Sequence, residues 1–169
     1  MADFLLDLAR SDTMAVRLAP ERVSLAAICR DAVETVGGAH AVDIDVDDDL
    51  LLVVDPNRLE QTLVNLIGNG LRHGKPPVVV RADRRVDRVR VEVTDHGPGV
   101  PAELLPDLFG AYSRGPAEDS NGLGLWVARL FVEASGGTLR HVPHPSAGTS
   151  FVLELPLEPA PAATGPARS

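Results

Sequence analysis

Cysteine is almost missing from this chain. The 169 residues include one cysteine, Cys29, so an internal disulfide and a thiolate metal cage are both excluded. Cys29 follows Ile28 on the apolar side of a helical pattern, where we expect a packed thiol rather than a reactive one. Aromatic residues make up only 4% of the chain, while valine, leucine and alanine recur throughout. We therefore expect an aliphatic core.

Long apolar runs and an excess of positive charge are also absent. No stretch approaches the roughly 18 to 20 apolar residues that cross a bilayer, and the N-terminus shows no secretion signal. Sixteen basic residues against 24 acidic ones give a formal net charge of -8, which repels polyanions on average. We expect a cytoplasmic chain that contacts neither nucleic acid nor membrane, which leaves open whether the full protein is anchored in the inner membrane. Any phosphate site must be built locally.

The spacing of apolar residues, together with the glycines and prolines that interrupt it, predicts the order of helices and strands. That order suggests a two-layer α/β sandwich, with one mixed, mostly antiparallel sheet and its helices on one face. The predicted elements are a helix at 25–36 between Ser24 and Gly37, strands at 42–46 and 50–54, a long helix from Asp55 to Gly74, a strand hairpin at 78–80 and 89–93, a short helix at 102–108, a helix at 123–134, and strands at 138–142 and 150–155.

Composition divides the chain into three parts. Residues 1–19 have a partly helical period that Pro20 stops, and they suggest the end of a helix whose packing partner is absent. Residues 20–156 hold the predicted elements of the main domain. Residues 157–169 are rich in proline, alanine and glycine with little to bury, so we expect a disordered tail.

The first candidate site stretch, at 65–73, reads Asn-Leu-Ile-Gly-Asn-Gly-Leu-Arg-His on the long helix. Asn65 and Asn69 are four residues apart and share a helix face, with Arg72 and His73 a turn further on. Magnesium takes hard oxygen ligands and guanidinium suits phosphate oxygens, so this face fits a Mg-triphosphate. The alternative is a helix face of solvated or loop-bonded amides.

The second stretch, at 95–100, reads Asp-His-Gly-Pro-Gly-Val directly after a valine-rich strand. A carboxylate at a strand end could accept from the exocyclic amine of a flat heterocycle. Gly97 and Gly99 would let backbone approach that ring closely. The alternative is an ordinary tight turn.

Two further stretches surround a loop of small residues at 113–122. Gly122, Leu123 and Gly124 open the next helix, where free amides at the positive end of the helix dipole suit phosphate; an ordinary helix start is the alternative. Before the loop, Phe109 and Tyr112 could anchor a lid while Arg114 reaches phosphate. Two aromatics at this spacing are usually just part of a core.

The order and separation of these stretches resemble the GHKL superfamily of ATPases, which includes histidine kinases, gyrase-type topoisomerases, heat-shock chaperones and mismatch-repair ATPases. The resemblance covers about residues 23–156 and implies a Bergerat-type ATP-binding fold. The matching segments are Asn65 to His73 for the asparagine box, Asp95 to Gly99 for the first glycine box, Phe109 to Tyr112 for the phenylalanine box, Gly122 to Gly124 for the second glycine box, and Gly148 to Phe151 for the closing strand motif.

The resemblance implies ATP and Mg²⁺ as ligands and a role for each matched residue. Asn69 would bind magnesium with Asn65 near the ion, and Asp95 would bind the adenine amine. The other implied roles are phosphate contact for Arg72, a ring beside the nucleotide for His73, shaping of the base pocket for Gly97 and Gly99, lid hinges at Gly122 and Gly124, and a water-mediated base contact for Thr149.

Position 65 separates two classes within that superfamily. Members that hydrolyse ATP place a glutamate four residues before the magnesium asparagine, as the general base for water. This chain has Asn65 there, and an amide cannot take the proton. A histidine kinase needs no such base because neutral imidazole is already nucleophilic. We therefore expect a histidine kinase catalytic domain, with Asn65 and Arg72 nearest the reaction.

The phosphate acceptor is expected on another domain. Residues 4–10 resemble the end of the second dimerisation helix of histidine kinases, and no histidine followed by an acidic residue occurs within 1–19. The expected partners are the histidine-bearing dimerisation domain of the same kinase and a response regulator. His40, His141 and His144 are expected at the surface. An anti-sigma-type serine kinase and a noncatalytic nucleotide-sensing module remain as alternatives.

Overall fold

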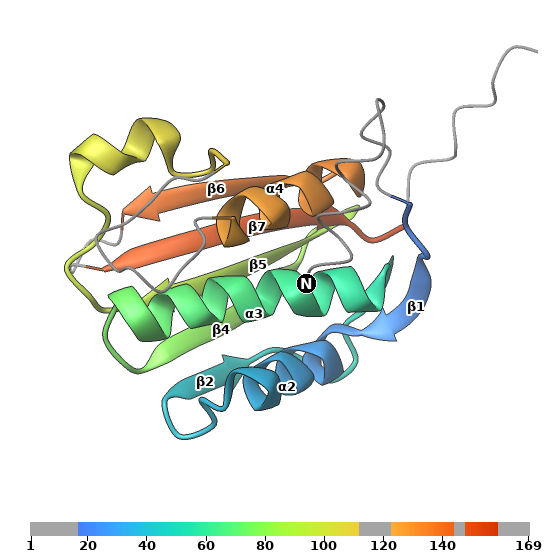
Figure 1. Ribbon diagram of the computed structural model, residues 1–169. Helices are drawn as coiled ribbons and strands as arrows, with labels where there is room; N and C mark the ends of the chain where they lie inside the picture. Colours follow the sequence, from blue (N-terminus) through green and yellow to red (C-terminus); the bar gives the residue numbers. More distant parts are fainter. Residues whose placement is uncertain (1–16, 112–122, 144–147, 159–169) are drawn as a thin grey trace, which may run out of the picture.

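The structure is a computed structural model that describes residues 17–111, 123–143 and 148–158. Figure 1 shows a sheet with helices packed in front of it. Along the chain the elements are β1 (Glu21–Ser24), α2 (Leu25–Val36), β2 (Val42–Asp45), β3 (Leu51–Val54), α3 (Pro56–His73), β4 (Val78–Arg84), β5 (Arg88–Asp95), the 3-10 helix η1 (Ala102–Asp107), α4 (Gly124–Ala134), β6 (Thr138–Pro143) and β7 (Thr149–Pro156).

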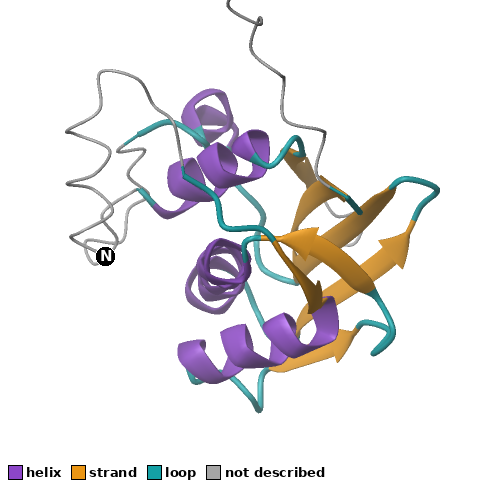
Figure 2. Ribbon diagram, turned by 90° about the vertical axis from the view of Figure 1, so that its right-hand side faces the viewer, coloured by secondary structure: helices purple, strands orange, loops and turns teal. Residues whose placement is uncertain are grey.

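The main sheet confirms the predicted fold class. Its five strands lie in the order β2-β4-β5-β7-β6, where β2 is parallel to β4 and every other neighbouring pair is antiparallel. Helices α2, α3 and α4 all cover the same face of this sheet (Figure 2). The β4–β5 hairpin predicted from alternating valines is present, with Val80 opposite Val93.

A second, two-stranded sheet corrects the expectation of a single sheet. The strands predicted at 42–46 and 50–54 form, but β2 joins β4 whereas β3 pairs with β1, a strand that the sequence analysis missed. Asp47 makes the turn between them, because its carboxylate accepts from the Asp49 amide and its carbonyl from the Leu50 amide. The two predicted strands therefore belong to different sheets.

Helix boundaries follow the predicted caps. The Ser24 hydroxyl accepts from the Ala27 amide at the start of α2, and Gly37, with φ +72°, ends that helix. Asp55 caps α3 by accepting from the Arg58 amide at 3.1 Å, followed by Pro56 in the first turn. Proline lacks the amide that a helix start leaves unpaired anyway, so it fits this position. The long helix that carries Asn65 and Asn69 is thereby fixed at its N-terminal end.

Aliphatic side chains fill the space between the helices and the sheet. Leu59, Leu63, Leu66 and Ile67 of α3 are fully buried against valines of β4 and β5. Cys29 is buried in the same cluster, which confirms the packed thiol. No helix among the described residues is long and apolar enough to cross a membrane.

The other face of the sheet carries charged side chains in cross-strand pairs. Arg81 of β4 contacts Asp45 of β2 at 3.1 Å, and Arg140 of β6 contacts Glu154 of β7 at 3.1 Å. These side chains are largely exposed, so each pair contributes little to stability. Their position explains the alternation of valine and charge in β5, since only one face of the sheet is covered by helices.

Contacts at both ends of the domain extend beyond the predicted boundaries. Ala19 donates its amide to Asp55 Oδ2 at 2.9 Å, and Leu18 packs against the core. The Leu157 carbonyl accepts from the Val53 amide, and the Leu157 amide donates to the backbone carbonyl of Asp87. Residues 1–16 and 159–169, with the predicted dimerisation-helix end and most of the predicted tail, lie outside the described residues.

Candidate functional site

Asp95 ends β5 beneath the C-terminal turns of α3. Its side chain is only 7% exposed, and one carboxylate oxygen accepts from the Gly97 amide at 2.7 Å. A β-carbon built on Gly70 of α3 would lie 3.5 Å from the Asp95 β-carbon. Asp95, the predicted base-binding residue, therefore packs against Gly70, which directly follows the predicted magnesium ligand Asn69 in the chain.

Thr149 faces Asp95 across the β5–β7 ladder. The two residues are direct register partners, so their side chains lie on the same, helix-covered face of the sheet. Thr149 is 4% exposed and Ser150, its neighbour, 1%. The closing strand motif and the first glycine box, far apart in sequence, thus meet at one point of the sheet.

Three glycines make room for the Asp95 carboxylate and backbone. A side chain at Gly74 would overlap the carboxylate of Asp95, and one at Gly97 would reach the Gly74 backbone. A β-carbon built on Gly148, which has φ +112°, would overlap the Asp95 carbonyl. Backbone therefore surrounds Asp95 on several sides. Gly74 was predicted only as a helix end, and its place beside Asp95 was missed.

Asn69 and Arg72 are in contact on α3. Arg72 donates to the Asn69 side-chain oxygen at 3.2 Å, and its guanidinium lies above Gly68. Asn69 is half-buried, while Arg72 and His73 are exposed. An asparagine oxygen and a guanidinium are thus adjacent and accessible at the end of α3 nearest Asp95.

Asn65 joins α3 to the start of α4. Its side-chain nitrogen donates to the Gly124 carbonyl at 3.1 Å, and a β-carbon on Gly124 would lie 3.3 Å from the Asn65 amide. Leu123, the N-cap residue, gives no side-chain cap to α4. The second glycine box is therefore brought to the asparagine box, and the first amides of α4 are not capped by a side chain from that residue.

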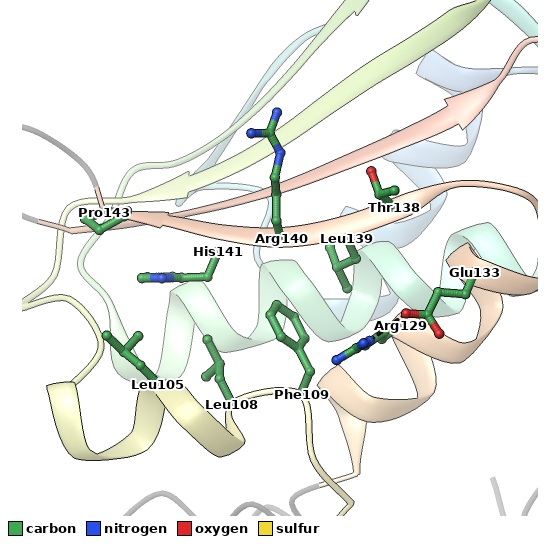
Figure 3. A pocket seen from close by; sticks show the side chains of 10 residues that line it. All are labelled: Leu105, Leu108, Phe109, Arg129, Glu133, Thr138, Leu139, Arg140, His141 and Pro143. Atoms are coloured by element: carbon green, nitrogen blue, oxygen red, sulfur yellow. Dashed lines mark hydrogen bonds and ion pairs between the residues drawn. The ribbon is translucent and has the colours of Figure 1, made fainter.

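Phe109 anchors the segment that leads toward the predicted lid. Its ring meets Phe151 of β7 edge-on, with centroids 6.2 Å apart, and the Arg129 guanidinium of α4 lies 6.0 Å from the Phe109 centroid. Figure 3 shows the Arg129 side chain pointing toward Phe109. Phe109 therefore contacts both β7 and α4. Tyr112, Ser113, Arg114 and Gly122, also predicted for the site or lid, lie outside the described residues.

A pocket of about 580 Å³ lies beside Phe109, between η1, α4 and β6 (Figure 3). Leu105, Leu108 and Leu139 line it together with His141. The His141 ring packs edge-on against Phe151 at 5.9 Å, and its Nε2 is buried without a hydrogen-bond partner among the described residues. Burial lowers the pKa of His141, and the nearby Asp95 charge partly opposes that shift. His141, expected at the surface, is thus half-buried, because an edge strand still presents one face to the helix layer.

The residues present fit a magnesium nucleotide. Among the described residues, no three His, Cys, Asp or Glu side chains gather as a ligand set for a metal ion. The Asn69 oxygen is instead a single hard donor, which suits a magnesium ion that takes its other ligands from phosphate and water. The predicted base-binding carboxylate of Asp95, the Asn69 oxygen and Arg72 all lie at the C-terminal end of α3.

Comparison with known proteins agrees with this geometry. Residues 54–159 match the family model described as histidine kinase-, DNA gyrase B- and HSP90-like ATPase. The signal transduction histidine-protein kinase AfsQ2 of Streptomyces coelicolor is 32% identical over 167 residues, which covers 96% of this chain and 31% of that protein. The sensor protein CseC of Streptomyces avermitilis is 40% identical over 136 residues, covering 73% of this chain and 27% of CseC. The chain thus spans about a third of these relatives.

Solved structures show the same fold. The mycobacterial sensor histidine kinase MprB superposes with a TM-score of 0.73 at 24% identity, covering 84% of this chain and 100% of that one. Full-length ShkA in complex with AMPPNP gives a TM-score of 0.74 at 28% identity over 94% of this chain and 35% of ShkA. The family match covers more than half of the chain. The chain belongs to the family of histidine kinase-, DNA gyrase B- and HSP90-like ATPases, with the fold of a histidine kinase catalytic domain.

Proposed function

We propose that this chain binds Mg-ATP and donates the γ-phosphate to a histidine on a dimerisation domain of the same kinase. One observation carries the proposal: Asp95 lies directly beneath the turn of α3 that holds Asn69 and Arg72. A nucleotide bound across this junction meets the carboxylate at its base and the amide and guanidinium at its phosphates. The AMPPNP complex of ShkA, a protein of the same fold, supports an ATP-like ligand.

Asp95 would recognise adenine through its exocyclic amine. One carboxylate oxygen already accepts from the Gly97 amide, which orients the group, and the other would accept from the amine. Guanine has a carbonyl oxygen at that position, and two acceptors facing each other repel. A site that holds Asp95 this firmly therefore favours ATP over GTP.

The phosphates would lie at the C-terminal end of α3. Asn69 would bind the magnesium ion through its side-chain oxygen, and Arg72 and His73 would face the phosphates. The amides at the start of α4, including those of Leu123 and Gly124, would donate to a phosphate, and Gly122 and Arg114 of the predicted lid would complete the contacts. When bound, magnesium neutralises charge on the phosphate oxygens.

The chemistry proposed is transfer to nitrogen rather than to water. The lone pair of a neutral imidazole forms the N–P bond at the γ-phosphorus while the bond to the bridging oxygen breaks, and ADP leaves with that electron pair. Asn65 donates its amide to Gly124, so it holds α4 against α3. It cannot act as the base that water attack requires.

Nucleotide binding is tested by thermal unfolding with millimolar Mg-ATP. We expect the melting temperature to rise with ATP concentration, because a ligand that binds only the folded state stabilises it. Asp95→Asn should remove most of that rise. Asp43→Asn, at an exposed position of β2, is the matched control and should keep it. An unchanged melting curve for the wild-type chain would count against the proposal.

Transfer is tested by mixing the chain with labelled ATP and a dimerisation domain that carries the acceptor histidine. We expect an acid-labile, alkali-stable label on that domain, followed by transfer to a response regulator. An acid-stable label on a serine-bearing partner would identify a serine kinase instead. Normal ATP binding without transfer to any acceptor would indicate a nucleotide-sensing module.

A further inference from the structure

His96, the residue after Asp95, fastens the loop between α3 and β4. Its backbone amide donates to the Lys75 carbonyl at 3.2 Å. Its ring Nδ1 lies 3.0 Å from the Pro77 carbonyl oxygen. A carbonyl oxygen only accepts, so Nδ1 must carry the hydrogen in this contact. One residue therefore holds both ends of the segment 75–77.

That segment continues directly from the backbone that packs on Asp95. Gly74 precedes Lys75, and any side chain on Gly74 would overlap the Asp95 carboxylate. A β-carbon built on Gly97 would lie only 2.5 Å from the Gly74 α-carbon, which is too close for two carbon atoms. Movement of residues 74–77 away from β5 would therefore open the wall against which the carboxylate rests.

We propose that His96 is a positioning residue for adenine recognition. By holding residues 75–77 it keeps Gly74 against Asp95, and so fixes the carboxylate where the exocyclic amine arrives. The inference rests on the proposed nucleotide site. The motif alone does not show it, because Pro77 lies 19 residues before His96 in the chain and meets it only in the fold.

His96 suits a test that separates positioning from folding. Its side chain is exposed, so removing it leaves the buried core unchanged. Asparagine carries an amide nitrogen close to the position of Nδ1 and can keep the donor, whereas leucine cannot. Adenosine and Mg-tripolyphosphate probe the two ends of the site separately, since only adenosine depends on Asp95.

The experiment measures the affinities of Mg-ATP, adenosine and Mg-tripolyphosphate for the wild-type chain, His96→Leu and His96→Asn by calorimetry. Loss of one hydrogen bond predicts roughly fivefold weaker binding of ATP and adenosine to His96→Leu. His96→Asn should bind within about twofold of wild type. Tripolyphosphate should bind all three alike. His96→Ala replaces His96→Leu should that variant not fold.

Two results would overturn the inference alone. Wild-type affinity of the leucine or alanine variant for adenosine would show that His96 does not position Asp95. Equal weakening of His96→Asn and His96→Leu would show that the donor is not what matters. Failure of the wild-type chain itself to bind Mg-ATP would overturn the proposed function, and the inference with it.

Discussion

His141 has an imidazole whose ionisation differs between the folded and the unfolded chain. Burial lowers its pKa from the usual 6.5, with a smaller opposing effect from Asp95. Between the folded and unfolded pKa values the unfolded chain binds more protons. The contribution of His141 to the free energy of unfolding is therefore fully present above pH 6.5. It is lost as the pH drops toward the pKa of His141 in the folded chain.

Replacing His141 should flatten that pH dependence. We expect His141→Leu to lose less stability than the wild-type chain between about pH 7 and pH 5, because it has no group to protonate there. Urea unfolding at several pH values measures this. His40→Gln, at an exposed turn residue, controls for loss of a histidine as such. Equal slopes for wild type and His141→Leu would contradict the assignment.

Cys29 should be inert in the folded chain. Burial raises its pKa to about 12, against a small lowering by Arg30, so the thiolate fraction at about pH 8 is on the order of 1 in 10,000. We expect no alkylation by iodoacetamide under native conditions and complete alkylation in urea, measured by mass spectrometry. Rapid native labelling would mean that α2 opens from the core.

Helix α3 depends at its start on both oxygens of Asp55. Oδ1 caps the helix at the Arg58 amide, and Oδ2 accepts from Ala19. Asp55→Ala should lose both interactions and cost roughly 2 kcal/mol of unfolding free energy. Asp55→Ser keeps a cap but not the second acceptor, and should cost roughly 1 kcal/mol. Denaturant unfolding measures both; equal costs would show that the cap contributes nothing, and an unchanged stability of Asp55→Ser would show the same of the Ala19 contact.

The junction between α3 and β5 should not tolerate a side chain at Gly74. The added methyl of Gly74→Ala would displace the Asp95 carboxylate, and we expect roughly tenfold weaker ATP binding or worse. Gly38→Ala is the matched control, because its methyl would meet only side-chain atoms of Leu71 and Val42. Calorimetric titration with Mg-ATP measures both. Unchanged affinity in Gly74→Ala would contradict the packing described for Asp95.

Local signals predicted most elements, and partners distant in sequence account for what was missed. Asp55-Pro56 and the leucine spacing indicated α3, and alternating valines indicated β4 and β5. Strand β1 was missed because it has four residues, ends at the Ser24 cap, and pairs with β3 about thirty residues later. The parallel pairing of β2 with β4 is likewise set across the intervening helix α3.

Across the whole molecule, the sequence could identify the residues of the candidate site but not their distances. Asp95, Asn69 and Thr149 were chosen from motifs, and the fold brings Asp95 beside α3 and opposite Thr149. The roles of Gly74 and His96 needed the fold, since each depends on contacts across the α3–β4 loop. The half-buried position of His141 also needed the fold, since its ring packs edge-on against Phe151 of β7.

The central claim is that one nucleotide bridges Asp95 and Asn69. Amide NMR during titration with Mg-ATP tests it most directly, because glycine amides resolve well and lie at both ends of the site. We expect Gly97 and Gly99 near the base, and Gly68 beside the Arg72 guanidinium, to shift together and saturate with a single dissociation constant. Shifts confined to one group, or two unrelated saturation curves, would contradict the account.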